Sequence, residues 1–432
     1  MANTYDTYKD SGVAWIGKIP NEWEIVRQKN IFSLTKILVE ESWETTPLLS
    51  LTTKGIKCID IGTTSGKVPD SYNTYQIVKP GDLVMCLFDL DCSAVFSGLS
   101  KTYGMISPAY KVLKVNEEYD PLYYSYWFDY IFDGRKFMYL SKNIRYSLTY
   151  DEFASLNIPN PSYAEQKTIA SFLDKKCVEI DSLIALQDEM ISELQAYKQS
   201  VITETVTKGL DPNAKMKDSG VEWFGEIPDD WNVRILSKII WLRARLGWKG
   251  LKAEEYVEFG YPFLSAFNII NNKLNWSDLN YINKQRYDES PEIKLSIGDV
   301  LIVKDGAGIG KTARVDNLPY GESTVNSSLG VITPSKILAY QYLYYFLLSN
   351  PFQNMVGFLK NGMGVPHLTQ ENMKSALIPI PPLSDQQAIA SYLDERTAQI
   401  DALISLKQEK IAELKDYKKS IIYEYVTGKK RV

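Results

Sequence analysis

The chain has 432 residues, a formal net charge of −5, 45% hydrophobic residues and 12% aromatic residues. This length exceeds one ordinary hydrophobic core, so we expect two or three domains. The negative charge argues against a protein that coats nucleic acid without sequence preference through electrostatic contacts to phosphates. It does not exclude a specific reader, which takes base contacts from local loops.

The four cysteines, Cys58, Cys86, Cys92 and Cys177, are irregularly spaced, and His367 is the only histidine. Zinc sites need clustered Cys and His ligands, so we expect no metal site. One histidine leaves little room for histidine acid–base catalysis, and we interpret His367 as a satisfied polar residue. The sequence lacks a long apolar run and a signal-peptide pattern, which predicts a cytoplasmic protein without a membrane segment.

Two segments of the chain occur twice. The motif KDSGVAWIGKIPNEWEI at 9–25 matches KDSGVEWFGEIPDDWNV at 217–233 at 10 of 17 positions. A longer segment, 166–207, matches 386–427 at 22 of 42 positions. Two similar halves predict a structure with pseudo-two-fold symmetry, and the divergent blocks between the repeats predict two different targets.

The divergent blocks, 27–157 and 235–377, carry comparable elements in the same order. Each has β-like stretches, at 78–88 and 109–115 in the first and at 295–306 and 329–334 in the second. The pairs Gly81-Asp82 and Gly298-Asp299 indicate matching turns before an apolar strand. An aromatic helix follows, at 121–132 and 338–349, and then a Leu-Thr phrase that leads into a proline-rich segment. We therefore predict two small α/β domains with a shared fold.

The repeated long segments have apolar residues at steps of three and four, which is typical of a heptad seam. Each begins after a proline-rich lead and ends near a glycine, at Gly209 and Gly428. At about 1.5 Å per residue, each predicts a helix on the order of 65 Å long. Such a stripe must be buried, and antiparallel pairing with its own repeat is the simplest arrangement; two unrelated surface helices are the alternative. The predicted seam consists of Leu173, Ile180, Ile184, Ile191, Leu194, Leu393, Ile400, Ile404, Ile411 and Leu414.

These elements predict an α+β fold in which two long helices, forming an antiparallel coiled coil, join two small α/β domains. We expect a first domain with its entry motif at 1–157 and a central repeated helix at 158–210. A second domain with its entry motif follows at 211–377, and a C-terminal repeated helix at 378–432.

This order of parts resembles the specificity subunits of type I restriction-modification enzymes. The resemblance rests on the KDSG.(E/A)W.G.IP..W entry motif, the LT…(L/I)IP.P lead and the Q…IA..LD….ID.LI helix. It implies a non-catalytic subunit in which each variable block reads one half of a bipartite double-stranded DNA site. It also implies that the helices set the spacing and dock two methyltransferase subunits, and that motor-nuclease subunits join the full complex. S-adenosylmethionine, ATP and Mg are then expected on those partner subunits and not on this chain.

Base readout favours polar and cationic side chains on loops, and basic-aromatic groups suit nucleic acid as well. No catalytic residue is assigned to the chain. The DNA-binding candidates are Thr52, Thr53, Lys54, Lys142, Asn143, Arg145 and Tyr146 in the first block, and Arg243, Arg245, Trp248, Lys249, Asn268, Lys311, Lys360 and Asn361 in the second.

Two other functions stay open. The stretch DGAGIGKT at 305–312 is similar to a phosphate-binding loop, but Asp305 stands where the motif needs glycine, so we interpret it as a turn inside a recognition domain. Tight ATP binding by the isolated chain would favour a nucleotide hydrolase. A coiled-coil scaffold that pairs two protein partners without reading DNA is the other alternative.

Overall fold

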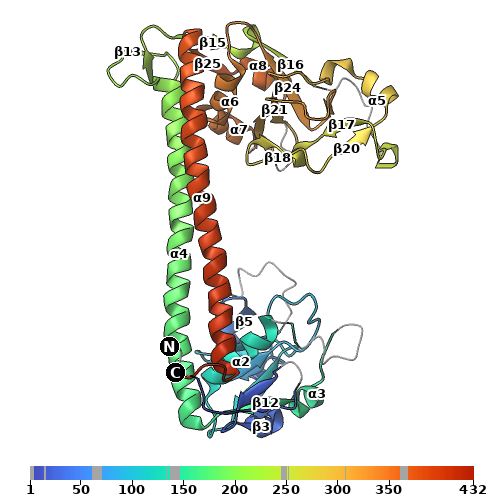
Figure 1. Ribbon diagram of the computed structural model, residues 1–432, viewed down its shortest axis with the longest axis vertical. Helices are drawn as coiled ribbons and strands as arrows, with labels where there is room; N and C mark the ends of the chain where they lie inside the picture. The colour runs from blue at the N-terminus through green and yellow to red at the C-terminus, as the bar shows by residue number, and fades with distance from the viewer. Residues whose placement is uncertain are drawn as a thin grey trace. The chain divides into compact units, whose positions relative to one another are not determined.

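The computed structural model describes residues 4–13, 16–60, 71–133, 135–136, 146–244, 251, 253–306, 308–360 and 368–432. The chain forms two compact units, Met1–Gln187 with Glu409–Val432, and Asp188–Gln408. Each unit combines sheets with helices, and the two long helices α4 (Tyr163–Lys208) and α9 (Leu383–Val426) each contribute to both (Figure 1). The predicted α+β class with two long helices is confirmed.

The repeated glutamine at the start of each long helix has a structural reason. Gln166 is buried, its amide nitrogen donates to the carbonyl of Pro161 at 2.9 Å, and its Oε1 accepts from the backbone nitrogen of Asp120 at 2.8 Å. Gln386 makes the same pair of contacts in the second unit, to Pro381 and Ala339. Each glutamine therefore ties the proline lead to the start of the aromatic helix, which explains why the residue occurs in both repeats.

The long helices pack against each other in antiparallel fashion within each unit. In the first unit the rings of Phe172 and Tyr425 lie 4.5 Å apart and Asp181 pairs with Lys418 at 2.7 Å. In the second unit Lys198 pairs with Asp401 at 2.6 Å. The seam residues are all buried or half-buried: Leu173, Ile180, Ile184, Ile191, Leu194, Leu393, Ile400, Ile404, Ile411 and Leu414.

The first unit contains two four-stranded sheets, in the orders β6-β5-β10-β7 and β4-β11-β8-β9, and two strand pairs, β1-β2 and β12-β3. Helix α2 packs against β9, and its aromatic side chains enter the core of the unit. The strands are β1 Tyr8–Asp10, β2 Lys18–Pro20, β3 Glu24–Arg27, β4 Phe32–Thr35, β5 Leu48–Thr52, β6 Gly55–Ile59, β7 Gln76–Val78, β8 Leu83–Met85, β9 Ser97–Leu99, β10 Gly104–Ile106, β11 Lys111–Val115 and β12 Asn157–Asn160; the helices before α4 are α1 Gln28–Ile31, η1 Glu40–Glu44, α2 Pro121–Asp133 and α3 Tyr150–Ser155.

The second unit repeats this plan with the orders β16-β24-β21-β22 and β20-β17-β23, and with the strand pairs β13-β14, β15-β25 and β18-β19. Its strands are β13 Met216–Asp218, β14 Glu226–Pro228, β15 Asn232–Ile235, β16 Ile240–Arg243, β17 Tyr261–Leu264, β18 Ile269–Ile270, β19 Lys273–Leu274, β20 Asn280–Ile282, β21 Val300–Val303, β22 Thr312–Arg314, β23 Thr324–Val325, β24 Leu329–Pro334 and β25 Leu377–Ile380. Its helices are η4 Leu236–Lys238, η5 Ala253–Glu255, η6 Ala266–Asn268, α5 Lys284–Asp288, η7 Pro291–Ile293, α6 Tyr340–Leu348, α7 Asn350–Lys360 and α8 Gln370–Ser375.

The entry motif packs against the end of a long helix in each unit. In the first unit a Cβ on Gly428 would lie 2.3 Å from Pro20 and 3.1 Å from Trp23, so only glycine fits there, and its φ of +68° also favours glycine. In the second unit the corresponding Cβ on Gly209 would lie 3.1 Å from Trp231. The repeated IP..W phrase of the entry motif therefore packs against the C-terminal end of a long helix in each unit.

The aromatic helices hold the same helix ends through hydrogen bonds. The hydroxyl of Tyr123 donates to the carbonyl of Val426 at 3.1 Å, and that of Tyr342 donates to the carbonyl of Val206 at 3.0 Å. Carbonyls in the last turn of a helix have no partner within the helix, so these bonds satisfy buried acceptors. The Leu-Thr phrase also has a local role, because Thr149 and Thr369 are the N-caps of α3 and α8.

Candidate nucleic-acid interface

The turn between β5 and β6 presents the first group of candidates. The hydroxyl of Thr52 donates to the carbonyl of Gly55 at 2.8 Å and accepts from the backbone nitrogen of Lys54 at 3.1 Å. Thr52 therefore stabilises the turn, and its hydroxyl is already used. Thr53 and Lys54 are exposed at the tip, where their side chains are free to contact a base edge or a phosphate.

In the second unit, Lys311 lies on the hairpin that joins β21 to β22. These strands are antiparallel, with Ile302 opposite Thr312, and the backbone nitrogen of Val303 donates to the carbonyl of Lys311 at 2.8 Å. A phosphate-binding loop joins a strand to a helix, so this topology excludes one and confirms the turn interpretation of 305–312. The Lys311 side chain is exposed.

Arg243 requires a correction, because its side chain is only 7% exposed. Its guanidinium pairs with the fully buried carboxylate of Asp299 at 2.7 Å and donates to the hydroxyl of Thr333 at 2.6 Å. A third bond reaches the carbonyl of Lys294 at 3.1 Å. A guanidinium used in this way has no surface left for DNA, so Arg243 holds the sheet of the second unit together.

Asn268 is also buried and has a structural role. Its Oδ1 accepts from the backbone nitrogen of Ser265 at 2.9 Å, and its Nδ2 donates to the carbonyl of Asp278 at 2.7 Å. These bonds fix the short helix η6, on which the neighbouring Phe267 is 91% exposed. An aromatic ring without packing partners suits stacking on bases or insertion between them. Sequence reasoning favoured polar residues here and missed Phe267.

Tyr146 is half-buried and adopts a left-handed backbone, with φ of +43°. Its carbonyl accepts from the backbone nitrogen of Leu90, which fixes the end of the loop before the Leu-Thr phrase. The other candidates on this loop and its counterpart lie outside the described residues: Lys142, Asn143, Arg145 and Asn361. Arg245, Trp248, Lys249 and His367 also lie outside the described residues. Lys360 is the last residue of α7, and its side chain is not among those described.

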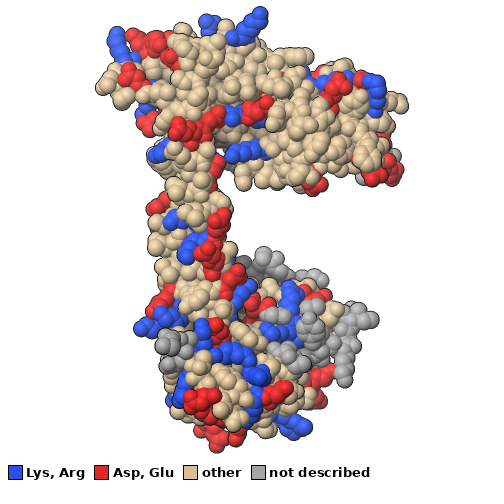
Figure 2. All heavy atoms as spheres, viewed as in Figure 1, with Lys and Arg blue, Asp and Glu red and all other residues tan. Residues whose placement is uncertain are grey.

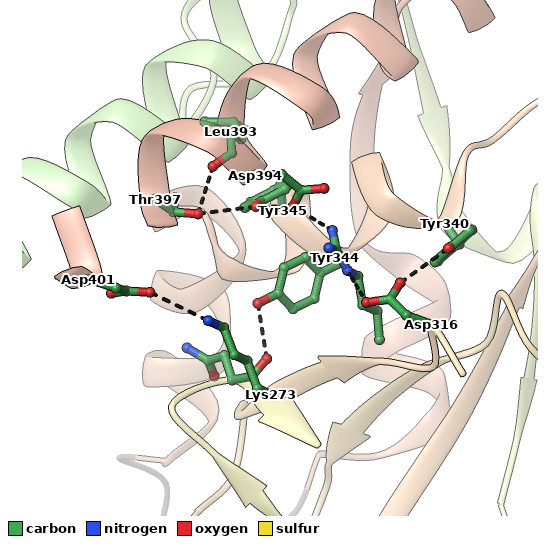
Figure 3. A network of polar contacts seen from close by, with 11 residues as sticks. Lys273, Asp316, Tyr340, Tyr344, Tyr345, Leu393, Asp394, Thr397 and Asp401 are labelled. Carbon is green, nitrogen blue, oxygen red and sulfur yellow. Dashed lines mark hydrogen bonds and ion pairs between the residues drawn. The ribbon is translucent and has the colours of Figure 1, made fainter. Parts of the chain in front are cut away.

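A polar network links β22 and α6 of the second unit to α9 (Figure 3). Arg314 on β22 pairs with Asp394 of α9 and with Asp316, at 2.7 and 2.8 Å. The hydroxyl of Tyr345 donates to the same oxygen of Asp394 at 2.5 Å, and the Arg314 guanidinium lies 5.3 Å from the ring centre of Tyr344. Burial alone would lower the pKa of Arg314, but the two carboxylates raise it above its ordinary value.

Comparisons with known proteins agree on one family. A family model for the type I restriction modification DNA specificity domain matches residues 228–416. The MjaVIII specificity subunit of Methanocaldococcus jannaschii is 26% identical over 431 residues, which cover 96% of this chain and 94% of the relative. Over nearly its whole length the chain is therefore similar to the type I restriction enzyme specificity subunits. Such a subunit is the non-catalytic member of its system.

Solved structures share the fold of this chain. One is a chain from a study of complex assembly and conformational transition of the type I restriction-modification system. It has a TM-score of 0.70 at 16% identity and covers 94% of this chain and 98% of its own. The HsdS subunit from Thermoanaerobacter tengcongensis has a TM-score of 0.50 at 17% identity and covers 95% and 98%. At these identities the likeness concerns the fold alone.

The surface of the chain carries both positive and negative side chains. On the face drawn in Figure 2, Lys and Arg side chains are interspersed with Asp and Glu in both units, which fits the net charge of −5. In the parts of the chain that the structure describes, no group of three or more His, Cys, Asp or Glu side chains is arranged to hold a metal ion. Within the same ranges, no helix is long and apolar enough to cross a membrane.

Proposed function

We propose that each recognition domain of this chain reads one half of a bipartite double-stranded DNA site. The observation that carries the proposal is that the two units share a scaffold of strands and helices but differ in the residues at their exposed loop tips. Both units have a four-stranded sheet with corresponding strand order, an aromatic helix and the same helix-end contacts. Their exposed tips differ, with Thr53 and Lys54 in one and Lys311 and Phe267 in the other. A shared scaffold with different tips is suited to two different sequences.

The proposed contact set follows from exposure. Thr53, Lys54 and Lys311 remain as exposed candidates and Phe267 is added to them, while Tyr146 stays a half-buried candidate. Thr52, Arg243 and Asn268 act within the fold. Lys142, Asn143, Arg145, Arg245, Trp248, Lys249, Lys360 and Asn361 stay proposed from sequence alone. The functional boundaries 1–157, 158–210, 211–377 and 378–432 also stay proposals.

We further propose that the long helices dock two methyltransferase subunits. Leu183 and Leu186 of α4 are about half exposed, and so are Leu403 and Leu406, which occupy the matched positions of α9. These leucines recur in both repeats although neither pair belongs to the seam. Exposed apolar residues on an otherwise polar helix favour a protein partner, and two copies favour two partners. S-adenosylmethionine, ATP and Mg would then be bound by the methyltransferase and motor-nuclease subunits.

Base-resolved adenine methylation of DNA in cells tests the reader role. With the methyltransferase partner present, a split motif should appear that disappears when this chain is removed. Methylation by an intact complex without any motif that depends on the chain would favour the scaffold alternative. Inserting one helical turn, about 5.4 Å, into both long helices should change the tolerated spacer by one to two base pairs. An unchanged spacer would contradict the role of the helices in spacing.

A further inference from the structure

The first unit contains a pocket of about 350 Å³ between β9, α2, α4 and the C-terminal part of α9. Its walls are partly apolar, with Leu122 and Val178, and partly polar. Three carboxylates, Asp129, Asp174 and Asp181, line it together with the two cations Lys101 and Lys418. Of the described residues that we propose to contact DNA, Thr53 also lines this pocket.

Among the described residues, only one of the three carboxylates, that of Asp181, forms an ion pair. Lys418 binds both oxygens of Asp181 at 2.7 Å. Asp174 receives only the hydroxyl of Tyr126 at 3.4 Å, and among the described residues Asp129 makes no hydrogen bond or ion pair. Burial raises the pKa of Asp129 to about 7, and Lys418 opposes the shift. Asp129 and Asp174 therefore line the pocket without forming an ion pair among the described residues.

In the second unit, the position that corresponds to this pocket is occupied by side chains of the chain itself. Asp174 and Asp394 are matched positions of the long repeats, and the tyrosines that bond to them, Tyr126 and Tyr345, are matched on the aromatic helices. In the second unit Asp394 also binds the guanidinium of Arg314 at 2.7 Å. The same carboxylate position thus ligates a cation in one half of the molecule and lacks one in the other.

The strand registers identify the residue that is missing. Leu83 and Val300 directly follow the matched pairs Gly81-Asp82 and Gly298-Asp299. Leu83 pairs with Leu99, and Val300 pairs with Arg314. Leu99 therefore occupies the place of Arg314. By the offset of the aromatic helices, Ser125 replaces Tyr344 and Asp129 replaces Leu348. Two large side chains that would fill the space are absent, and one carboxylate is added.

We propose that this pocket binds an alkyl-ammonium or alkyl-guanidinium group, with the cation paired to Asp174 and Asp129 and the alkyl chain against Leu122 and Val178. The group comes either from a free small amine or from a Lys or Arg side chain of a partner protein. A cationic group on an alkyl chain fits the pocket from either source. In the second unit, the guanidinium of Arg314 pairs with the matched carboxylate in the same way. The partner source rests on the proposed docking of other subunits, whereas the free amine does not.

Titration calorimetry of the full chain with agmatine, which carries a guanidinium and an amine on a four-carbon chain, tests the free source. We expect saturable binding at one site, weakened at least tenfold by Asp174→Asn and by Asp129→Asn. Leu99→Arg should abolish it by supplying the cation from within the chain. Asp6→Asn removes an exposed charge elsewhere and should leave binding unchanged. Hydrogen exchange of residues 97–106 shows whether Leu99→Arg stays folded.

The affinity of the chain for its methyltransferase partner tests the second source. If a partner side chain fills the pocket, Leu99→Arg and Asp174→Asn should weaken that complex at least tenfold, and agmatine should compete with it. Saturable agmatine binding without an effect on the complex would assign the pocket to a free amine. If agmatine shows no saturable binding and the variants also keep their affinity for the partner, the proposal is overturned. The DNA-reading role would be unaffected by that result.

Discussion

Replacing Arg243 by methionine separates a structural role from DNA contact. The substitution keeps an unbranched chain but leaves the carboxylate of Asp299, which is fully buried, without its ion pair. Asp299 would retain only the backbone nitrogen of Ser296 and the hydroxyl of Thr333. Removing one partner of a buried ion pair destabilises a protein by about 3–5 kcal/mol. Because the pair lies inside the second unit, the loss should be confined to that unit.

Urea unfolding followed by hydrogen exchange gives the local free energy. With a slope of about 2 kcal/mol per molar urea, the loss lowers the midpoint for peptides covering β21 and β24 by about 1.5–2.5 M. Peptides of the first unit, such as those covering β8 and β11, should keep their midpoint and are the internal control. The double variant Arg243→Met with Asp299→Asn should lose less than about 2 kcal/mol, because no buried charge is left unpaired.

The first unit supports this reasoning with a natural counterpart. Asp82 occupies the position of Asp299 and accepts from the backbone nitrogen of Lys79 at 2.8 Å, but Thr35 stands where the arginine would be. Burial raises the pKa of Asp82 above its ordinary value. An unchanged midpoint for Arg243→Met, together with at least a tenfold loss of DNA affinity, would refute the structural role and restore Arg243 as a DNA contact.

Three further predictions concern pH, docking and readout. The pKa of Asp129 is about 7 in the folded first unit and near 4 in the unfolded chain, so the wild-type unit should lose stability as pH rises between these values. In urea unfolding, the Asp129→Asn variant should have the same free energy of unfolding as the wild type at pH 4 and a higher one at pH 8. Leu183→Ser with Leu186→Ser should leave a complex with one methyltransferase by native mass spectrometry, whereas unchanged stoichiometry would argue against the docking role. Lys311→Ala should cost about 1–3 kcal/mol of discrimination and relax only one half-site of the methylated motif, and Lys54→Ala only the other; a uniform effect on both would indicate phosphate contacts.

The long helices and the entry motifs were predictable because their sequences occur twice in the chain. The residues Gln166 and Gln386, Trp23 and Trp231, and the helix-end glycines recur, and each has a packing reason that a repeat makes visible. Periodicity then located the long helices, whose bounds differ from the repeated segments by only a few residues. The turns at Gly81 and Gly298, with φ of +92° and +93°, followed from the Gly-Asp signal.

The candidate site was less predictable, because residue type does not reveal burial. Arg243 and Asn268 have side chains suited to base readout, yet the same hydrogen-bonding capacity serves a buried ion pair in one case and a turn in the other. Phe267 has an apolar ring that composition assigns to a core, but the structure exposes it. Which of these applies depends on contacts between residues far apart in the sequence, such as Arg243 with Asp299 and Thr333, that periodicity does not report.

The two halves of the chain also show how recognition can change without loss of the fold. Tyr123 and Tyr342 bond to the carbonyls at helix ends, so they must be kept in both halves. Leu99 and Arg314 occupy the same strand position with opposite chemistry, and the sheet accepts both because the side chains point to a pocket in one case and to Asp394 in the other. Positions that bond to the helix frame are therefore constrained, whereas positions that face solvent or a pocket are free to diverge. A scaffold with this division lets each half acquire its own ligand while the long helices stay the same.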